Sequence, residues 1–337
     1  MRIIDGRMLS LSLFILILMS GCIHDYPHPV KGSSQKGETP NVLIASIEVS
    51  YTLSWENISH IVEVSPQTKA RPERPHRFVI EVCKDGEVVC SDVEYLTYDE
   101  FALGKFSHKI SANLKQELYQ VAVWYDLQNE EEDFPFSAET LDNIRLSNYS
   151  TTDAESLQCA FAYDTLDLTD VEYFDKERVV YKEMTLNHAG GRFEIIATDI
   201  QQFISNFHNA MLGGDSFTAH LFLSKDTPLG YNIYNDSFYY NREDDVVFSG
   251  RMRLPFDDYE ELKIAEGFIF CNEDTSISLS LGVKNSSLVT VVQTDNFSFP
   301  VKRGHITKVY GNFLSNMIDG IFSIDNQWDG EIVLELY

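Results

Sequence analysis

The sequence predicts an all-β protein made of two antiparallel β-sandwich domains with one or two short helices. Apolar and polar residues alternate with a period of two along most of the chain, for example over Ser276–Val283, as in strands that bury one face. Asp-Gly pairs, which favour tight turns, separate such runs at positions 85–86 and 329–330. Helical periodicity is sparse. The predicted strands cover residues 42–53, 77–82, 119–127, 219–224, 276–283, 287–294 and 331–337.

The first 21 residues have the organisation of an export signal. Arg2 and Arg7 precede an apolar run from Met8 to Met19, and Asp5 weakens this positive charge without cancelling it. A membrane-spanning helix needs about 20 apolar residues, so the run is too short to remain in the bilayer. Residues 1–21 are therefore predicted to be a signal peptide that is removed from the mature chain.

The apolar run is followed by Ser20, Gly21 and Cys22, a triplet that resembles the lipobox of bacterial lipoproteins. In that family the signal is cut before the cysteine and the thiol is acylated. The resemblance implies cleavage between Gly21 and Cys22, and several acyl chains on Cys22 that anchor the protein stably. Met19 stands where the family usually has Leu. The alternative is a plain signal peptide followed by an incidental cysteine.

Residues 22–40 are predicted to be a flexible tether, because they contain three prolines and two glycines but few large apolar side chains. The length of the remaining chain favours two domains. The boundary is placed in the acidic, loop-like stretch 164–178, after which new strands begin at Val179. This gives an N-terminal β-sandwich domain at 41–165 and a C-terminal β-sandwich domain at 166–337.

Two segments have helical features. One apolar helix face is predicted from the spacing of Ile200, Phe203, Ile204 and Phe207. Thr198 or Asp199 is the expected N-cap of this helix. Residues 137–146 are predicted to form a short second helix, with Ser137 as its cap.

Cys83 and Cys90 flank a hairpin whose turn is formed by residues 85–86. A type I′ turn at this pair places Cys83 opposite Val88. The two sulfur atoms are then expected on one face of the hairpin at diagonally offset positions. A disulfide is one outcome for an exported protein, but the pattern favours two small buried apolar side chains.

Composition and motifs exclude several function classes. The chain has 52 acidic and 26 basic residues, a net charge of −26, which argues against nucleic acid as a partner and indicates a soluble surface. The other four cysteines lack the paired spacing of a zinc site, so no metal is expected. The segment 325–330 has some features of a calcium loop, but Leu336 stands where a bidentate Glu is needed. A looser calcium site there is the alternative to a plain turn.

No catalytic residue and no cofactor are predicted, because the sequence has no nucleophile elbow, phosphate-binding glycine loop or HExxH pair. A group of aromatic residues follows the segment "TPLG", and it has two interpretations. It is either a carbohydrate-stacking surface or, as the strand pattern favours, part of the packing of a sheet. Its members are Tyr231, Tyr234, Phe238, Tyr239 and Tyr240.

Several segments carry a family resemblance. They are "YQVAVWYDL" (119–127), "ETLDNIRL" (139–146), "CAFAYDTLDL" (159–168), "GGRFEIIATDIQQFI" (190–204), "TPLGYNIYNDS" (227–237), "FPVKRGHITKVYGNFL" (299–314) and "FSIDNQWDGEIVLEL" (322–336). Together they resemble the fimbrillin-like lipoproteins of Bacteroidales, the class that builds or anchors type V pili. The resemblance covers nearly all of residues 41–337 and carries no catalytic residues. It implies two transthyretin-like β-sandwich domains on an outer-membrane lipid anchor.

Pilins of this class polymerise by strand exchange. A protease removes the first strand after an Arg, and a strand of the neighbouring subunit fills the groove. Here no Arg occurs between Arg7 and Arg71, so the first strand is expected to stay in place. This favours an anchor or a free-standing surface protein over a shaft pilin. The terminal strand is either a donor to a partner or the last strand of its own domain, and its inward-facing residues are Ile332, Leu334 and Leu336.

The sequence thus predicts a lipid-anchored, non-enzymatic protein of the outer membrane that acts as a fimbrial accessory or anchor subunit or as an adhesin. Its expected partners are the membrane, through the lipid on Cys22, and fimbrial subunits bound by strand addition. The alternative is a surface glycan-binding lipoprotein of a nutrient-uptake system. The sequence leaves open whether the protein faces the periplasm or the cell exterior.

Overall fold

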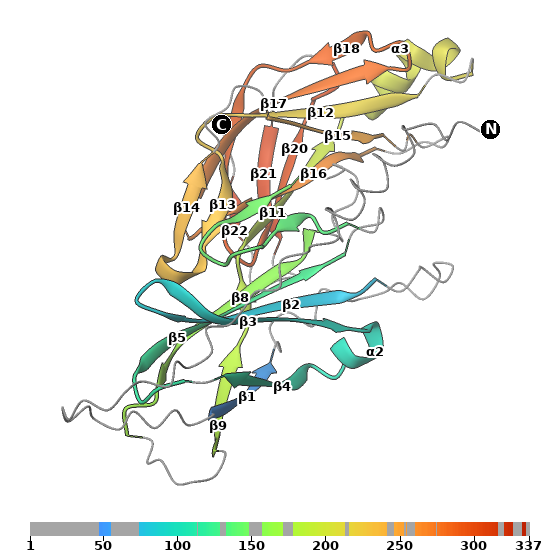
Figure 1. Ribbon diagram of the computed structural model, residues 1–337. Coiled ribbons are helices and arrows are strands. Elements are labelled where there is room, and N and C mark those ends of the chain that lie inside the picture. Colours follow the sequence, from blue (N-terminus) through green and yellow to red (C-terminus); the bar gives the residue numbers. More distant parts are fainter. Residues whose placement is uncertain are drawn as a thin grey trace, which may run out of the picture. The chain divides into compact units, whose positions relative to one another are not determined.

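Strands dominate the computed structural model, and the all-β prediction is confirmed (Figure 1). The described residues form five β-sheets and include two α-helices, α2 (Tyr98–Phe101) and α3 (Ile200–Leu212). The structure describes residues 47–54, 74–112, 114–128, 133–147, 157–170, 178–212, 216–240, 246–252, 254, 260–273, 275–315, 320–325 and 332–334.

An antiparallel five-stranded sheet, here called the central sheet, has both faces buried along β2 and β5. Its order is β10 (Asn187–His188), β8 (Cys159–Asp167), β5 (Leu118–Leu127), β2 (His76–Lys84) and β3 (Glu87–Leu96). Along β2, Phe78 and Ile80 belong to one hydrophobic core and Val79 to another. Burial on both sides explains why β2 and β5 are nearly continuous apolar runs.

A three-stranded sheet packs against the central sheet and encloses the smaller core. Its order is β4 (Lys105–Ala112), β1 (Ile47–Ser54) and β9 (Arg178–Thr185). Met184 of β9 is buried in this core, and Phe106 of β4 packs against it. β9 is the first strand after the predicted domain boundary, yet it pairs with β1 of the predicted N-terminal domain. The division at residues 165 and 166 stays a prediction.

The remaining strands form three sheets around the larger core. One has the order β16 (Leu262–Phe270), β11 (Gly190–Ala197), β20 (Ile306–Gly311), β21 (Gly320–Asp325) and β22 (Ile332–Leu334). The next has β15 (Val246–Arg251), β12 (Phe217–Leu223), β17 (Thr275–Asn285) and β18 (Thr290–Gln293), with β19 (Phe297–Val301) also on β17. The last has β14 (Ser237–Tyr240), β13 (Pro228–Asn232), β7 (Ile144–Leu146) and β6 (Phe136–Ser137).

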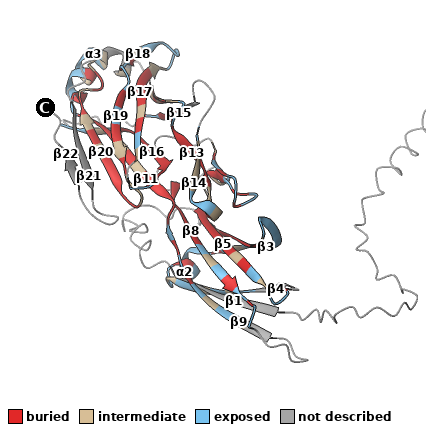
Figure 2. Ribbon diagram, turned by 90° about the vertical axis from the view of Figure 1, so that its left-hand side faces the viewer, coloured by how far each residue is buried: buried red, intermediate tan, exposed pale blue. Residues whose placement is uncertain are grey.

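The larger core takes residues from both halves of the chain. Trp124 and Phe136 come from the first half, and Phe193 and Leu279 come from the second. Figure 2 shows the buried residues running along β11, β16 and β17. All described residues fall within one unit, Ile44–Tyr337.

The predicted helix after residue 198 is confirmed as α3. Ile200 and Phe203 are buried, and Phe207 packs against the same core. The Asp199 carbonyl accepts a hydrogen bond from the Phe203 N–H, as expected of an N-cap, while its carboxylate accepts one from the Leu314 N–H at 2.9 Å. Among the described residues, no helix is long and apolar enough to cross a bilayer.

The predicted second helix at residues 137–146 is wrong. Ser137 ends β6 and pairs with Arg145 of β7, with a turn between the two strands. Leu141 of this turn is fully buried, and its N–H donates to the Glu81 carboxylate at 3.2 Å. Contacts with residues distant in sequence therefore outweigh the local helix propensity.

The hairpin turn at residues 85–86 is confirmed, because both residues have positive φ angles (52° and 85°) and Cys83 pairs with Val88. A β-bulge between Val82 and Cys83 places Val82 opposite Cys90. Cys90 therefore packs on the smaller core with Val82, whereas Cys83 lies on the other face. The expectation that both sulfur atoms share a face is wrong. The bulge adds one residue to β3 between Val88 and Cys90, and this moves the Cys90 side chain to the opposite face of the hairpin. Both thiols are free.

Candidate functional site

The first described strand, β1, lies between two other strands for its whole length. It pairs with β4 in antiparallel register from Ile47 opposite Ala112 to Ser54 opposite Lys105. On its other side it pairs with β9 in parallel register over the same eight residues. Loss of β1 would therefore leave the backbone N–H and C=O groups of β4 and β9 that now pair with β1 without partners.

The predicted terminal strand is β22, which stands at the end of its sheet. It pairs with β21 in antiparallel register, with Ile332 opposite Ile324 and Leu334 opposite Phe322. Leu336 lies outside the described residues. Whether this strand also donates to a partner stays a prediction.

Cys22 and Gly21 lie outside the described residues, together with the rest of the predicted signal peptide and tether. The segment 326–331, which contains most of the weak calcium-loop pattern, is outside them as well. Lipidation of Cys22 and cleavage before it therefore stay predictions.

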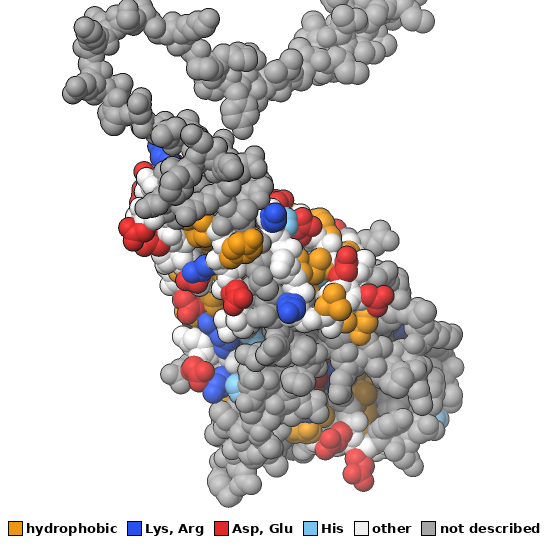
Figure 3. Space-filling view, turned by 90° about the horizontal axis from the view of Figure 1, so that it is seen from below, with side chains coloured by type: hydrophobic (Ala, Val, Ile, Leu, Met, Phe, Trp, Pro, Cys, Tyr) orange, Lys and Arg blue, Asp and Glu red, His pale blue; other side chains and the backbone are white. Residues whose placement is uncertain are grey.

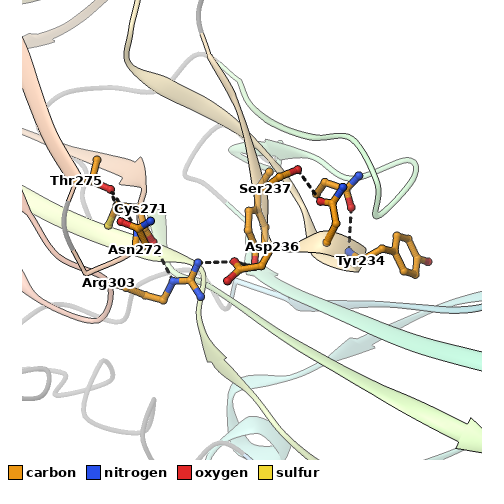
Figure 4. A network of polar contacts seen from close by, with 10 residues as sticks. Tyr234, Asp236, Ser237, Cys271, Asn272, Thr275 and Arg303 are labelled. Carbon is orange, nitrogen blue, oxygen red and sulfur yellow. Dashed lines mark hydrogen bonds and ion pairs between the residues drawn. The ribbon is translucent and has the colours of Figure 1, made fainter.

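A polar network fastens the start of β14 to the end of β16 (Figure 4). The Arg303 guanidinium donates to Asp236 Oδ1 at 2.7 Å and to the Cys271 carbonyl oxygen at 2.8 Å. The Tyr231 hydroxyl donates to the same Asp236 oxygen at 2.7 Å. Burial alone would raise the pKa of Asp236, but these two donors lower it, so the carboxylate stays ionised.

A second polar cluster joins the short 3₁₀ helix η3 (Ile233–Asn235) to the central sheet. The Tyr234 hydroxyl donates to Glu81 Oε2 at 2.6 Å and accepts from the Cys83 thiol at 2.7 Å. Glu81 is 1% exposed, and burial raises its pKa. Burial also raises the pKa of Tyr234, so its hydroxyl keeps its proton. Both clusters therefore join segments that are distant in sequence through side-chain hydrogen bonds.

The aromatic group after "TPLG" is mainly part of the packing, as the strand pattern favours. Tyr231 is fully buried and stacks against Phe238 and Phe270, with both ring centroids 5.7 Å away. Tyr239 lies against the Arg145 guanidinium, 4.3 Å from its ring centroid. Tyr240 is the member with a half-exposed side chain, at 53%.

The structure brings together three side chains that the sequence analysis did not single out. Asp92 and Glu94 of β3 lie beside His108 of β4, and a ligand atom of each lies within 4.8 Å of the others. The three residues are divided between strands of two different sheets. The sequence shows two carboxylates at alternate positions of one strand, but it does not show that a histidine of another strand lies beside them.

The face shown in Figure 3 carries acidic, basic and hydrophobic side chains at short distances from one another. Exposed apolar side chains do gather on β3, the end strand of the central sheet. They are Val88, Val89, Val93 and Tyr95, which are between 42% and 56% exposed. Apolar side chains on an end strand are typical of surfaces that contact other proteins.

Solved structures with a distant likeness include two fimbrial proteins. The fimbrial anchor protein Mfa2 from Porphyromonas gingivalis is 12% identical, with a TM-score of 0.47 over 87% of this chain and 100% of that one. A fimbrial assembly protein from Parabacteroides distasonis is 13% identical, with a TM-score of 0.38 over 86% of this chain and 99% of that one. A comparison with curated proteins gave no match.

A family model, described as a family of unknown function (DUF6562), matches residues 41–337. The match begins where the predicted tether ends and continues to the last residue of the sequence. The chain therefore belongs to the DUF6562 family.

Proposed function

We propose that the protein is a non-enzymatic, lipid-anchored surface protein of the outer membrane that serves as an accessory or anchor subunit of a fimbria or as an adhesin. The observation that carries this proposal is the position of β1, which is paired along its whole length with β4 and with β9.

The paired position of β1 supports a subunit that keeps its own first strand. In strand-exchange assembly the first strand is cut away, and the groove it leaves accepts a strand of the next subunit. Here the groove is filled by the chain itself, and no Arg lies between Arg7 and Arg71 to direct the cut. A subunit with a filled groove ends or anchors an assembly instead of extending it.

Two features of the described strands suit contact with a neighbouring subunit. β22 ends its sheet, so a further strand can add beside it, and β3 ends the central sheet with exposed apolar side chains. Asp92 and Glu94 place two charged side chains on β3 beside His108, and charges on an end strand discourage uncontrolled pairing. We therefore assign strand addition to β22 and side-chain contact to the exposed face of β3.

Recovery of the native protein from outer membranes after mild crosslinking tests the proposed role. We expect fimbrial subunits to be recovered with it as a ladder of crosslinked products. Recovery of glycan transporters in their place would contradict the fimbrial role and support the nutrient-uptake alternative. Recovery of the protein alone would also contradict the accessory role.

A Cys22→Ala variant tests the anchor. We expect this variant in the soluble fraction after cell fractionation, because the acylated thiol is gone. Cys90→Ala is the matched control, since it removes a cysteine outside the lipobox and should leave the protein in the membrane fraction. Retention of Cys22→Ala in the membrane would contradict lipid anchoring through this residue.

A further inference from the structure

β3 and β4 bring together, at the edge of the smaller core, three side chains of the types that ligate metal ions. Asp92 and Glu94 are two residues apart on β3, so they project from the same face of the strand. His108 comes from β4, in the facing sheet. Its Nε2 lies 2.9 Å from Asp92 Oδ2, and its Nδ1 lies 3.1 Å from Glu94 Oε1.

The cluster occupies positions that are otherwise apolar. On the same face of β3, Cys90 packs against the smaller core and Leu96 is buried in it, and on β4 Phe106 packs against it two residues before His108. The cluster thus places two carboxylates and one imidazole in a row of core-facing side chains. One imidazole supplies at most one positive charge, so a divalent cation would complete the neutralisation of the two carboxylates.

The contacts of His108 also have the form expected of a metal ligand. Carboxylate oxygens only accept hydrogen bonds, and a neutral imidazole donates at one nitrogen alone. A metal ion bound at one ring nitrogen would leave the other nitrogen to carry the N–H that a carboxylate accepts. Metal-bound histidines usually donate their other N–H to a carboxylate, and His108 has a carboxylate at each nitrogen.

We propose that Asp92, Glu94 and His108 bind a divalent transition-metal cation of the zinc type. The imidazole ligand favours such an ion over Ca²⁺ or Mg²⁺, which prefer oxygen ligands. Asp92 and Glu94 contact different nitrogens of the His108 ring, and one ion bonds to only one of these nitrogens. One carboxylate must therefore move to the nitrogen that holds the ion. Asp92 and Glu94 are 46% and 40% exposed, which leaves them room to move.

A cation at this position connects two sheets. β3 belongs to the central sheet, where it pairs with β2. β4 belongs to the three-stranded sheet, where it pairs with β1. The metal ion adds a link between β3 and β4. Because the folded chain alone presents the three ligands together, binding should also raise the melting temperature.

Calorimetric titration of the purified full chain with Zn²⁺ alone tests the proposal. We expect one site per chain in the unmodified protein, and an affinity for Zn²⁺ that is at least tenfold weaker in His108→Ala. Two matched controls should keep the site. His220→Ala removes a half-buried histidine of β12, and Cys90→Ser removes the nearby free thiol, which could bind zinc by itself.

Glu94→Gln provides a second test if His108→Ala fails to fold, because it keeps the shape of a half-exposed side chain and removes one ligand charge. We expect Zn²⁺ to raise the melting temperature of the unmodified chain and of both controls, but not of Glu94→Gln. Equal zinc binding by His108→Ala and the unmodified chain would overturn the proposal. So would the absence of zinc binding in the unmodified chain, which would leave the cluster as an ion pair that protects the end strand β3.

Discussion

The Tyr234 hydroxyl donates a 2.6 Å hydrogen bond to Glu81, across 153 residues of sequence. Glu81 is almost fully buried on β2, and Tyr234 belongs to η3 in the second half of the chain. The other donor to the same carboxylate oxygen is the Leu141 N–H, from the turn between β6 and β7. One buried carboxylate therefore joins three segments that are far apart in the sequence.

Removal of the Tyr234 hydroxyl should destabilise the protein. We expect Tyr234→Phe to lower the free energy of unfolding by about 1–3 kcal/mol, because Glu81 stays buried with one donor fewer. Urea denaturation followed by tryptophan fluorescence measures this change. Tyr240→Phe removes the same atom from a half-exposed side chain and should change stability by less than about 0.5 kcal/mol. Equal effects of the two substitutions would contradict the role of the Glu81 contact.

The second prediction concerns the ion pair between the buried Asp126 and Arg77. Arg77 donates to both of its carboxylate oxygens, at 2.8 and 2.5 Å, and the Trp124 N–H donates at 3.1 Å. Arg77→Met leaves this fully buried carboxylate without its cation, so we expect a loss of about 3–5 kcal/mol in the free energy of unfolding. The double variant Arg77→Met with Asp126→Leu should regain part of this loss in the same denaturation experiment. No recovery would show that the packing of Arg77 matters more than its charge.

The third prediction is that burial of His76 makes the stability of the protein depend on pH. Its ring stacks on Phe101 at a centroid distance of 3.9 Å, and its Nδ1 lies 2.9 Å from the Tyr125 hydroxyl. Burial lowers the pKa of His76 from 6.5 to about 4. Between these values the unfolded chain binds a proton that the folded chain does not, so stability falls as the pH drops from 6.5 to 4. The full effect is about 3 kcal/mol at 1.36 kcal/mol per pKa unit.

Denaturation curves between pH 4 and pH 7 measure this contribution. His76→Phe keeps an aromatic ring at the position and removes the titrating group. We expect its stability to depend less steeply on pH than that of the unmodified chain over this range. Identical pH dependence of the two proteins would rule out His76 as the source.

The central position of β1 gives the fourth prediction. Proline at Val49 removes a backbone N–H in the middle of the strand, where Val49 lies between Ile110 of β4 and Val180 of β9. We expect Val49→Pro to lower the free energy of unfolding by about 3 kcal/mol or more, the scale of proline backbone effects. Ser33→Pro, in the predicted tether, is the control and should leave the unfolding midpoint unchanged. A stable Val49→Pro variant would show that β1 is dispensable for the fold.

Local patterns in the sequence were sufficient for many elements of this fold. The alternation of apolar and polar residues predicted the strand at residues 276–283, the 3.6-residue spacing from Ile200 to Phe207 predicted α3, and the Asp85-Gly86 pair predicted its turn. Each of these features depends on residues a few positions apart. Their physical causes are the side-chain period of strands and helices and the backbone angles that a turn requires.

The helix prediction at 137–146 failed for a reason that local patterns do not contain. The spacing of Leu141 and Ile144 also suits a turn followed by a strand. That alternative is stabilised by the Glu81 carboxylate, which comes from a strand about 60 residues earlier. The reversed face of Cys90 has a similar origin, because a bulge in β3 became visible only in the register of two paired strands.

The sequence by itself determined the all-β class, the main helix, the hairpin turn and the expectation of an export signal with a lipid anchor at Cys22. Only the tertiary structure decided which strands are neighbours. It placed β1 between β4 and β9, and it brought Asp92 and Glu94 to His108. The physical reason is that side-chain periodicity specifies which face of a strand is buried, whereas its partners are chosen by the packing of the whole core.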